Sequence, residues 1–417
     1  MGIDRDAVDA LGDEVLDWRF KAIPASAYGS TVRDYVRAHR PLDEFGTPLL
    51  TFDESALNHN VRLMADWTRE AGVELAPHGK TTMAPQLWLR QLDAGAWGIT
   101  VANLPQVRVA RAFKVRRVLL ANSLLDEAGL AWLAGELEKE PEFDFLCWVD
   151  SVRSVELMDE ALRTARAQRV VDVCVELGGP HGRTGVRDEN DAVTVAEAVR
   201  KAATLRLVGT AGYEGALAHD SSSEGLAAVD TYLRRLADLY GRLSYETDEP
   251  VVTAGGSSYF DQVVDALGGL DATVVLRSGA YIIHDDGFYR QISPFARTLP
   301  GPDRFRPAMH GWARVVSRPE PGLALLDAGK RDLPFDEDMP MPQFVRGRGA
   351  QPTAEARITA LNDQHAYLRG SQAEVGEVVR LGLSHPCTAC DKWNLIPVVD
   401  DADATHPVIV DLIRTWF

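Results

Sequence analysis

Cysteine, basic side chains and long apolar runs are all scarce in this chain of 417 residues. Four cysteines in that length exclude a disulfide scaffold. No stretch of about 18 or more consecutive apolar residues occurs, which predicts that the chain has no transmembrane helix. Lys and Arg number 44 against 61 Asp and Glu, a formal net charge of -17 that argues against general affinity for nucleic acid or an anionic membrane. We therefore expect small-molecule chemistry.

The beginning of the chain lacks the basic start and apolar middle of a secretory signal. Residues 1–16 alternate acidic and apolar side chains instead, so we expect a cytoplasmic protein. A hydrophobic content of 46% with 25% charged residues is typical of a globular enzyme. The length exceeds what one small core needs, which favours two domains or a barrel with an appendage.

Short apolar runs and amphipathic helical patterns alternate through the middle of the chain. The runs are nearly continuous rather than alternating, as in parallel strands that are buried on both faces. Eight strand–helix units predict a (β/α)8 barrel. The alternative, a doubly wound open sheet, lacks a Gly-x-Gly-x-x-Gly turn after its first strand. The eight runs are Val73–Pro77, Trp97–Ala102, Arg117–Ala121, Phe143–Val149, Val170–Leu177, Leu205–Gly209, Pro250–Ala254 and Ala272–Arg277.

The segments on either side of this repeat have other patterns. Thr47–Phe52 is expected to be a strand, followed by a helix that Asp53 or Ser55 caps. Towards the C-terminus, short apolar runs are separated by Pro, Gly and Asp turns, with Arg331–Ala350 as a long loop. The expected strands are Gly311–Arg318, Gly322–Asp327, Arg357–Leu361, His365–Leu368, Val375–Leu381, Leu395–Val399 and Val408–Ile413. We predict an α/β fold with a helical arm (1–45), a (β/α)8 barrel (46–285) and a mostly antiparallel β domain (286–417).

A lysine follows the first apolar run, in the sequence Pro77-His78-Gly79-Lys80-Thr81-Thr82. Barrel enzymes carry their active sites at the carboxyl ends of the strands. A lysine in a partly dry site has a lowered pKa and becomes a nucleophile, which is what a Schiff base requires. A surface lysine at a strand end is the alternative interpretation of Lys80.

Three later strand ends are expected to meet Lys80 at the same mouth. The loop Gly255–Ser258 has glycines, hydroxyls and a following helix start, which together suit a phosphate group, although a plain turn explains it as well. Arg183 has three candidate partners: a phosphate, a substrate carboxylate or Glu176. Tyr213 lies either in the core or against a flat ring.

A second group of chemically active side chains lies in Ser384-His385-Pro386-Cys387-Thr388-Ala389-Cys390-Asp391. Two residues apart on an extended segment, His385 and Cys387 point to the same side and can bind one metal ion, and a thiolate favours zinc. Cys390 or Asp391 is a candidate third ligand. A loop without metal is the alternative. The remaining cysteines, Cys147 and Cys174, lie in apolar runs and are expected in the core.

In this order, the motifs around Lys80, Gly212-Tyr213-Glu214-Gly215, Ala254-Gly255-Gly256-Ser257 and His385-Pro386-Cys387 resemble one branch of the fold-type III pyridoxal-phosphate enzymes. That branch holds the metal-dependent D-serine dehydratases and D-threonine aldolases, and alanine racemase is the best-known relative. The resemblance covers residues 45 to 417. It implies that Lys80 binds the cofactor and removes the α-proton of a D-amino acid. It further implies a cofactor pocket and a metal site, formed respectively by His78, Arg183, Tyr213, Gly255, Gly256 and Ser257, and by His385 and Cys387.

The same resemblance leaves two reactions open. In a dehydratase, zinc acts as a Lewis acid on the β-hydroxyl, giving a keto acid and ammonia from a D-serine-like substrate. In an aldolase the hydroxyl is deprotonated and the Cα–Cβ bond breaks, giving glycine and an aldehyde. The aldolase branch generally has a carboxylate in place of Cys387 and takes a harder metal such as manganese, so the sequence favours the dehydratase. Asp391 keeps the aldolase open.

Two further hypotheses and the assembly state complete the expectations. A metal-free racemase would need a second base, for which Tyr367 is the nearest candidate. A protein that binds pyridoxal phosphate without catalysis would have no use for His385 and Cys387. By the resemblance we expect a homodimer, while the preferred substituent at Cβ is left open.

Overall fold

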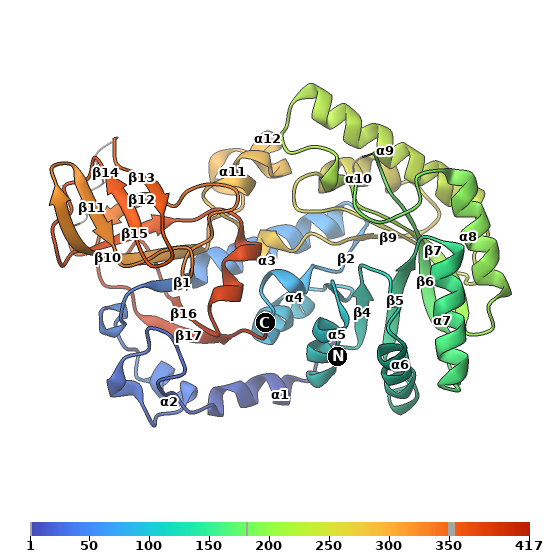
Figure 1. Ribbon diagram of the computed structural model, residues 1–417, viewed down its shortest axis with the longest axis horizontal. Helices are drawn as coiled ribbons and strands as arrows, with labels where there is room; N and C mark the ends of the chain where they lie inside the picture. The colour runs from blue at the N-terminus through green and yellow to red at the C-terminus, as the bar shows by residue number, and fades with distance from the viewer. Residues whose placement is uncertain (1, 181, 349–354) are drawn as a thin grey trace. The chain divides into compact units, whose positions relative to one another are not determined.

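The computed structural model describes residues 2–180, 182–348 and 355–417 (Figure 1). Its residues fall into two compact units. The first unit contains Met64–Lys80 and Gln91–Gly279 with the first residues of the chain. The second contains Arg5–Leu63, Thr81–Arg90 and Ala280–Phe417. Among the described residues, no helix has both the length and the apolar character needed to cross a membrane.

The first unit is built on a parallel sheet that closes into a barrel. In the part of the chain described, the sheet has eight strands in the order β2-β9-β8-β7-β6-β5-β4-β3. A bridge between His78 and Thr100, and a hydrogen bond of 2.7 Å from the Trp97 amide to the Leu75 carbonyl, join the two ends. The strands are β2 (Glu74–Leu75), β3 (Ile99–Val101), β4 (Arg117–Leu120), β5 (Asp144–Val149), β6 (Val171–Leu177), β7 (Leu205–Gly212), β8 (Val251–Ala254) and β9 (Thr273–Leu276). Seven of the expected runs each contain one strand, and the eighth, Leu205–Gly209, lies within β7, so the (β/α)8 barrel is confirmed.

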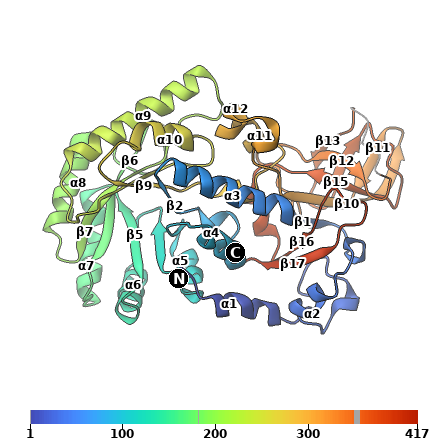
Figure 2. The ribbon, with the colours of Figure 1, turned by 180° about the vertical axis from the view of Figure 1, so that it is seen from behind.

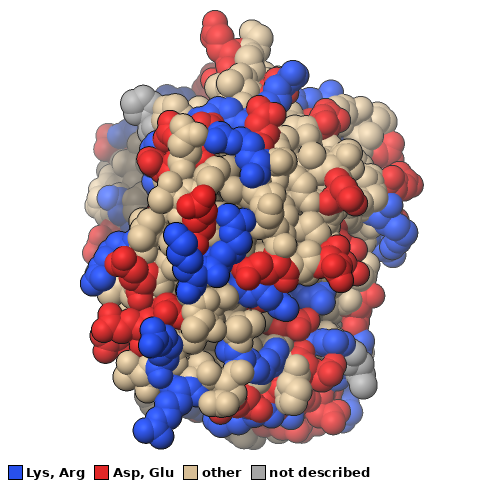
Figure 3. Space-filling model, turned by 90° about the vertical axis from the view of Figure 1, so that its right-hand side faces the viewer, with Lys and Arg blue, Asp and Glu red and all other residues tan. Residues whose placement is uncertain are grey.

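Helices cover the outer side of these strands, as both ribbon views show for α6 to α9 (Figures 1 and 2). Most start at a side chain that accepts an amide of the first turn, such as Asp126 before α6 and Ser222 before α9. Inside, Trp148, Leu119 and Cys174 belong to one buried cluster. The helices are α5 (Leu104–Ala112), α6 (Glu127–Lys139), α7 (Val152–Thr164), α8 (Glu189–Lys201), α9 (Ser223–Arg242) and α10 (Phe260–Leu267). Figure 3 shows one face of the molecule, on which acidic and basic side chains are interspersed.

The second unit contains a mostly antiparallel sheet, as expected. Within the described ranges it has nine strands, in the main order β13-β14-β11-β10-β1-β16-β17, with β15 pairing β10 and β12. The pairing of β1 with β16 is parallel. All the strands expected after residue 286 are present. The sheet consists of β1 (Leu49–Asp53), β10 (Met309–Glu320), β11 (Leu323–Leu326), β12 (Met341–Val345), β13 (Arg357–Leu361), β14 (Ala366–Arg369), β15 (Val378–Gly382), β16 (Leu395–Val399) and β17 (Ile409–Arg414).

Short helices complete this unit. The N-terminal segment is helical and mixed, with 3₁₀ turns around two short helices. Two more short helices precede β10. Helices α3 and α4 contribute residues to both units. The helices are α1 (Arg5–Asp9), α2 (Val32–Arg37), α3 (Glu54–Glu70), α4 (Pro85–Asp93), α11 (Phe288–Ile292) and α12 (Pro294–Thr298).

The expectation of a loop over Arg331–Ala350 is wrong for its middle part. Met341–Val345 forms β12, which pairs with β15 in a register that places Val345 opposite Val379. A strand next to Pro and Asp becomes stable here because a partner much later in the chain supplies its hydrogen bonds. Residues 349 and 350 of the expected loop lie outside the described part of the chain.

The expected domain boundaries at residues 45 and 285 differ from the two compact units. Leu49–Asp53 pairs with β10 and β16 in the antiparallel sheet, and the second unit therefore includes residues ahead of the barrel. Of the two expected caps of α3, Asp53 makes the bond, because its Oδ1 accepts the Ala56 amide at 2.7 Å. Its other oxygen accepts the Ala402 amide at 2.7 Å, so the cap also links two distant segments of this unit.

Candidate functional site

The end of β2 carries the predicted catalytic lysine and a histidine with an unused nitrogen. Lys80 is half-buried in a 3₁₀ turn, Gly79–Thr81. His78 Nδ1 is buried and, among the described residues, has no hydrogen-bond partner. Burial, followed by the charges of Lys80 and Arg277, holds the pKa of His78 well below its ordinary value, so the ring is neutral. A buried nitrogen without a partner indicates a place where a bound group completes the hydrogen bonding.

The ends of β7 and β8 are connected by a carboxylate that the sequence analysis did not single out. Glu214 is fully buried, and its two oxygens accept the amides of Gly255 at 3.0 Å and Gly256 at 2.7 Å. Gly255 has a φ of +98°, and a Cβ there would lie 2.8 Å from Leu276 Cδ2. The positive φ of Gly255 therefore requires a glycine at that position of the loop. The amides of both glycines, which we expected to face a phosphate, are already engaged by Glu214, and a phosphate role for Gly255, Gly256 and Ser257 stays a prediction.

Three predicted site residues from different strand ends lie together. The guanidinium carbon of Arg183 is 5.1 Å from the ring centroid of Tyr213, which is a cation–π contact. A Cβ at Gly256 would lie 3.1 Å from Tyr213 Cε2, so the loop after β8 runs close to this ring. Of the partners considered for Arg183, Glu176 is not paired with it among the described residues. Arg183 faces an aromatic ring instead.

A tyrosine outside the predicted site fixes the position of Tyr213. The Tyr232 hydroxyl accepts the Tyr213 amide at 3.0 Å and donates to the Leu177 carbonyl at 2.6 Å. It thereby connects the ends of β6 and β7. Tyr232 is almost fully buried on α9, and burial raises the pKa of its hydroxyl, so it stays protonated and can donate.

Arg277, at the end of β9, is a buried cation that sequence reasoning assigned only to a strand. It donates to Thr253 Oγ1 and to the Gly212 carbonyl, both at 2.6 Å. Burial lowers its pKa, and the charges of Glu214 and Glu176 oppose that shift. Glu176 Oε2 is itself buried, and no hydrogen-bond partner for it is found in the described part of the chain. The sequence did offer a signal for Arg277, because it is a charged residue at the end of an otherwise apolar run. Burying such a residue costs free energy unless hydrogen bonds or opposite charges compensate for it.

The residue after Arg277 completes the same arrangement. Ser278 Oγ donates to the Gly256 carbonyl at 2.8 Å, and a Cβ on Gly279 would lie 2.5 Å from the His78 carbonyl oxygen. The end of β9 therefore runs next to both the glycine loop and His78. These residues fit a flat aromatic cofactor: Lys80 supplies an amine, His78 an unused nitrogen, and Tyr213 with Arg183 a ring and a cation.

The predicted metal ligands lie in the second unit, but not on an extended segment. His385 has a φ of +59° and precedes a 3₁₀ turn, Pro386–Thr388, so the stated reason for their common direction is wrong. The turn still brings the two side chains together. Burial would lower the pKa of His385, but its interactions with Cys387 and Asp336 outweigh that and raise it to about 9. Cys387 Sγ also lies 3.5 Å from Oγ1 of Thr81, the residue after Lys80.

The ring and the backbone of His385 are each held by a carboxylate that the sequence analysis missed. Its Nδ1 is 2.5 Å from Asp336 Oδ2, and its amide donates to Asp285 Oδ2 at 2.8 Å. A histidine that binds a metal through one nitrogen usually donates the other to a carboxylate or carbonyl. The pair of imidazole and thiolate therefore fits a divalent metal with open coordination positions.

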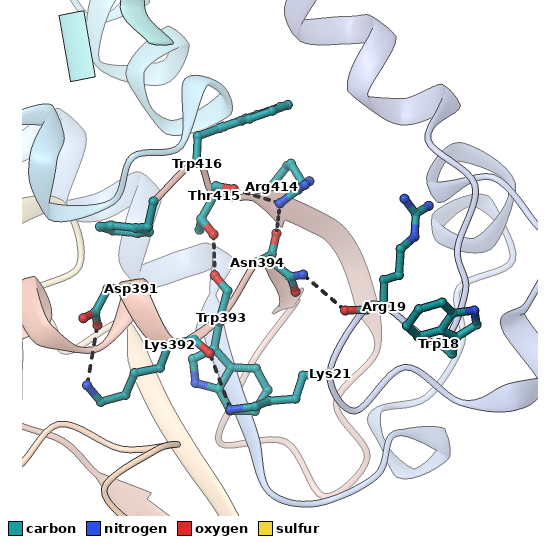
Figure 4. Close-up of a pocket in the computed structure, with 11 residues that line it drawn as sticks. Trp18, Arg19, Lys21, Asp391, Lys392, Trp393, Asn394, Arg414, Thr415 and Trp416 are labelled. Carbon is teal, nitrogen blue, oxygen red and sulfur yellow. Dashed lines mark hydrogen bonds and ion pairs between the residues drawn. The ribbon is translucent and has the colours of Figure 1, made fainter. Parts of the chain in front are cut away.

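Neither candidate third ligand joins this pair. Cys390 is fully buried, and burial raises the pKa of its thiol, as in an ordinary core cysteine. The Asp391 carboxylate lies 3.6 Å from Lys392 Nζ and lines a pocket with Trp18, Lys21 and Arg414 (Figure 4). In the described ranges, no group of three or more His, Cys, Asp and Glu side chains is placed to hold a metal. The second base considered for a racemase, Tyr367, accepts a hydrogen bond from Asn362 at 3.1 Å.

Comparisons with known proteins agree on one group of enzymes. Residues 308–399 match the family model described as a putative serine dehydratase domain. The chain is 29% identical to the D-threonine aldolase of an Arthrobacter species, over 83% of this chain and 86% of that protein. It is 25% identical to the 3-hydroxy-D-aspartate aldolase of Paracoccus denitrificans (strain Pd 1222), over 84% and 87%.

Solved structures show the same fold. The D-threonine aldolase of Filomicrobium marinum superimposes with a TM-score of 0.75 at 25% identity, covering 90% of this chain and 97% of that one. The D-threo-3-hydroxyaspartate dehydratase of Delftia sp. HT23 gives a TM-score of 0.70 at 21% identity, covering 89% and 98%. The second likeness concerns the fold alone.

Proposed function

We propose that this chain, which resembles the fold-type III pyridoxal-phosphate family of D-serine dehydratases and D-threonine aldolases, cleaves β-hydroxy-D-amino acids to glycine and an aldehyde. The same resemblance supports a pyridoxal-phosphate-dependent lyase of D-amino acids. One observation carries the finer proposal: two aldolases are similar to it over more than four-fifths of its length. This support outweighs the motif argument for D-serine-type dehydration.

We assign the cofactor to the barrel residues of the first unit. Pyridoxal phosphate, when bound, supplies the electron sink of the reaction. Lys80 would hold it covalently. In the cleavage it would donate the proton that Cα gains as glycine forms, and in a dehydration it would remove the proton from Cα. His78 offers a buried Nδ1 for a hydrogen bond, and Tyr213 with Arg183 offers a ring and a cation. Two buried residues fix the loops around this group. Arg277 joins the ends of β7 and β8, and Glu214 accepts the glycine amides of the loop after β8.

We assign a divalent metal to His385 and Cys387. When bound, it supplies a Lewis acid for the β-hydroxyl oxygen. A thiolate ligand favours zinc, with manganese as the alternative if oxygen ligands dominate. Asp336 occupies His385 Nδ1, which leaves Nε2 as the ligand atom.

Dehydration of a D-serine-like substrate is the second candidate. The specific observation in its favour is the thiol at position 387 together with the match of residues 308–399 to a putative serine dehydratase domain. A softer ligand set retains zinc, the metal of the dehydratase branch. A homodimer and a cytoplasmic location stay expectations, and light scattering after size exclusion tests the first of them.

A product assay on D-threonine separates the candidates, because that substrate can be cleaved or dehydrated. The purified protein is analysed for metal, supplied with cofactor and incubated with D-threonine, with L-threonine and the Lys80→Ala variant as controls. We expect glycine and acetaldehyde. If 2-oxobutanoate and ammonia form instead, the dehydratase replaces the proposal, and if threonine is only epimerised, both are wrong.

A further inference from the structure

An acidic loop with no assigned role contacts the segment that carries the predicted metal ligands. The loop contains Asp336, Glu337 and Asp338, and it contacts the segment at both ends. Ser384 Oγ donates to Asp338 Oδ2 at 3.1 Å, and Thr388 Oγ1 donates to Asp336 Oδ1 at 2.6 Å. The remaining oxygen of Asp336, Oδ2, lies 2.5 Å from His385 Nδ1. One carboxylate of this loop therefore contacts a predicted metal ligand, and the other accepts a hydrogen bond from the flanking Ser384.

The backbone of His385 is held independently of this loop. Its positive φ is a conformation that a residue other than glycine adopts only when its surroundings impose it. Asp285 provides such a constraint, because its Oδ2 accepts the His385 amide while its Oδ1 accepts the amides of Gly287 at 3.1 Å and Tyr289 at 2.9 Å. With the main chain fixed by Asp285, the contact with Asp336 determines the remaining freedom, the orientation of the imidazole ring.

The chemistry of imidazole gives this contact a consequence for metal binding. A neutral imidazole has one N–H and one lone pair, and a carboxylate at Nδ1 favours the tautomer with its hydrogen there. The lone pair is then at Nε2, where it can bind a metal. The bond from Thr388 keeps the carboxylate itself from rotating away. Side-chain exposure is 38% for Asp336 and 21% for His385, so the pair lies near solvent, where rotation would be easy without the contact.

We propose that Asp336 is a positioning residue that orients His385 and fixes its tautomer, and so determines how tightly the site binds a divalent metal. The inference rests on the metal site of the proposed function. It adds that Asp336, which is distant in sequence from His385 and Cys387, determines how tightly these two residues bind the metal. Asp338 provides the matched comparison, because it belongs to the same loop and accepts a hydrogen bond from Ser384, which is not a predicted ligand.

The test measures zinc affinity of the cofactor-loaded protein by competition with a chromophoric chelator. Removal of a carboxylate partner of a ligating histidine typically weakens metal binding by about 10–100-fold, and we expect that loss for Asp336→Ala. Asp336→Asn should lose less, since its amide oxygen still accepts from Nδ1–H. Asp338→Asn should bind as the wild type does. Circular dichroism and the visible absorbance of bound cofactor check that each variant is folded.

Cobalt gives a second readout that a purely structural role would not change. In the Co²⁺-loaded protein, the thiolate-to-cobalt absorption reports on Cys387, and the weaker d–d bands report on the whole ligand set. We expect Asp336→Ala to keep the first and shift the second. Zinc affinity of Asp336→Ala equal to wild type, or an equal loss in Asp338→Asn, would overturn this inference alone. Wild-type protein that binds no metal would overturn the proposed metal site as well.

Discussion

Glu214 offers the most direct test of how the loop after β8 is held. Its carboxylate is fully buried and accepts two backbone amides, from Gly255 and Gly256. The substitution Glu214→Ala would leave both amides inside the protein without an acceptor. It would also remove one of the two negative charges that oppose the lowered pKa of buried Arg277.

The size of the effect follows from these two bonds. An unsatisfied buried amide costs about 1–3 kcal/mol, so the loss of both acceptors should destabilise the first unit by at least about 2 kcal/mol. For a domain of this size, about 1 kcal/mol lowers the melting temperature by roughly 2–4 °C, which gives a decrease of about 4–8 °C. Glu214→Gln keeps one accepting oxygen and should show about half of that decrease.

Calorimetry of the cofactor-free and cofactor-loaded protein measures this prediction. Because the chain has two compact units, its thermal unfolding can show more than one transition, each with its own melting temperature. The relevant transition is the one that rises on addition of pyridoxal phosphate, because a ligand stabilises the unit that binds it. If Glu214→Ala melts within about 1 °C of the wild type, the two amide bonds do not stabilise the protein and the reasoning fails.

Three other predictions follow from the sites. Lys80→Ala should abolish the visible absorbance of covalently bound cofactor while the exposed Lys201→Ala keeps it, and a Lys80→Ala protein with the band intact would contradict the assignment. Cys387→Ala should lose stoichiometric metal and retain cofactor, whereas Cys390→Ala should retain both; metal retained in Cys387→Ala argues against the site. Burial raises the pKa of Asp286 from 3.8 to about 6, so its ionisation costs stability as the pH rises through that range, and Asp286→Asn should gain up to about 3 kcal/mol relative to wild type between pH 4 and 7. Urea unfolding at both pH values measures this gain, and a difference that does not change with pH would refute it.

The strands of the barrel could be predicted because their signal is local. Strands buried on both faces consist of apolar residues throughout, and each run in the sequence therefore marks one strand. The sequences of β1 and β12 contain no such local signal for the sheet that each strand joins. Which sheet Leu49–Asp53 joins, and whether Met341–Val345 is a strand at all, depends on partners hundreds or tens of residues away.

The same distinction applies to the predicted cofactor pocket. Reading the residues after each strand predicted Arg183 and Tyr213, and the structure brings them into contact. Glu214 stood in a quoted motif, but nothing in the sequence reveals that its oxygens bind the amides of Gly255 and Gly256. Arg277 was missed for another reason: it stands at the end of an apolar run and was counted as part of that strand.

The predicted metal ligands show how a prediction of residues can rest on incorrect geometry. We selected His385 and Cys387 because alternate residues of an extended segment share a face, yet the segment is a turn that starts from a positive φ. Two carboxylates distant in sequence, Asp285 and Asp336, hold His385 at its amide and its ring. The two predicted ligands could therefore be proposed from the sequence, whereas their orientation depends on acidic residues that no local pattern connects to them. A variant series on Asp336 tests the part of the site that the sequence could not supply.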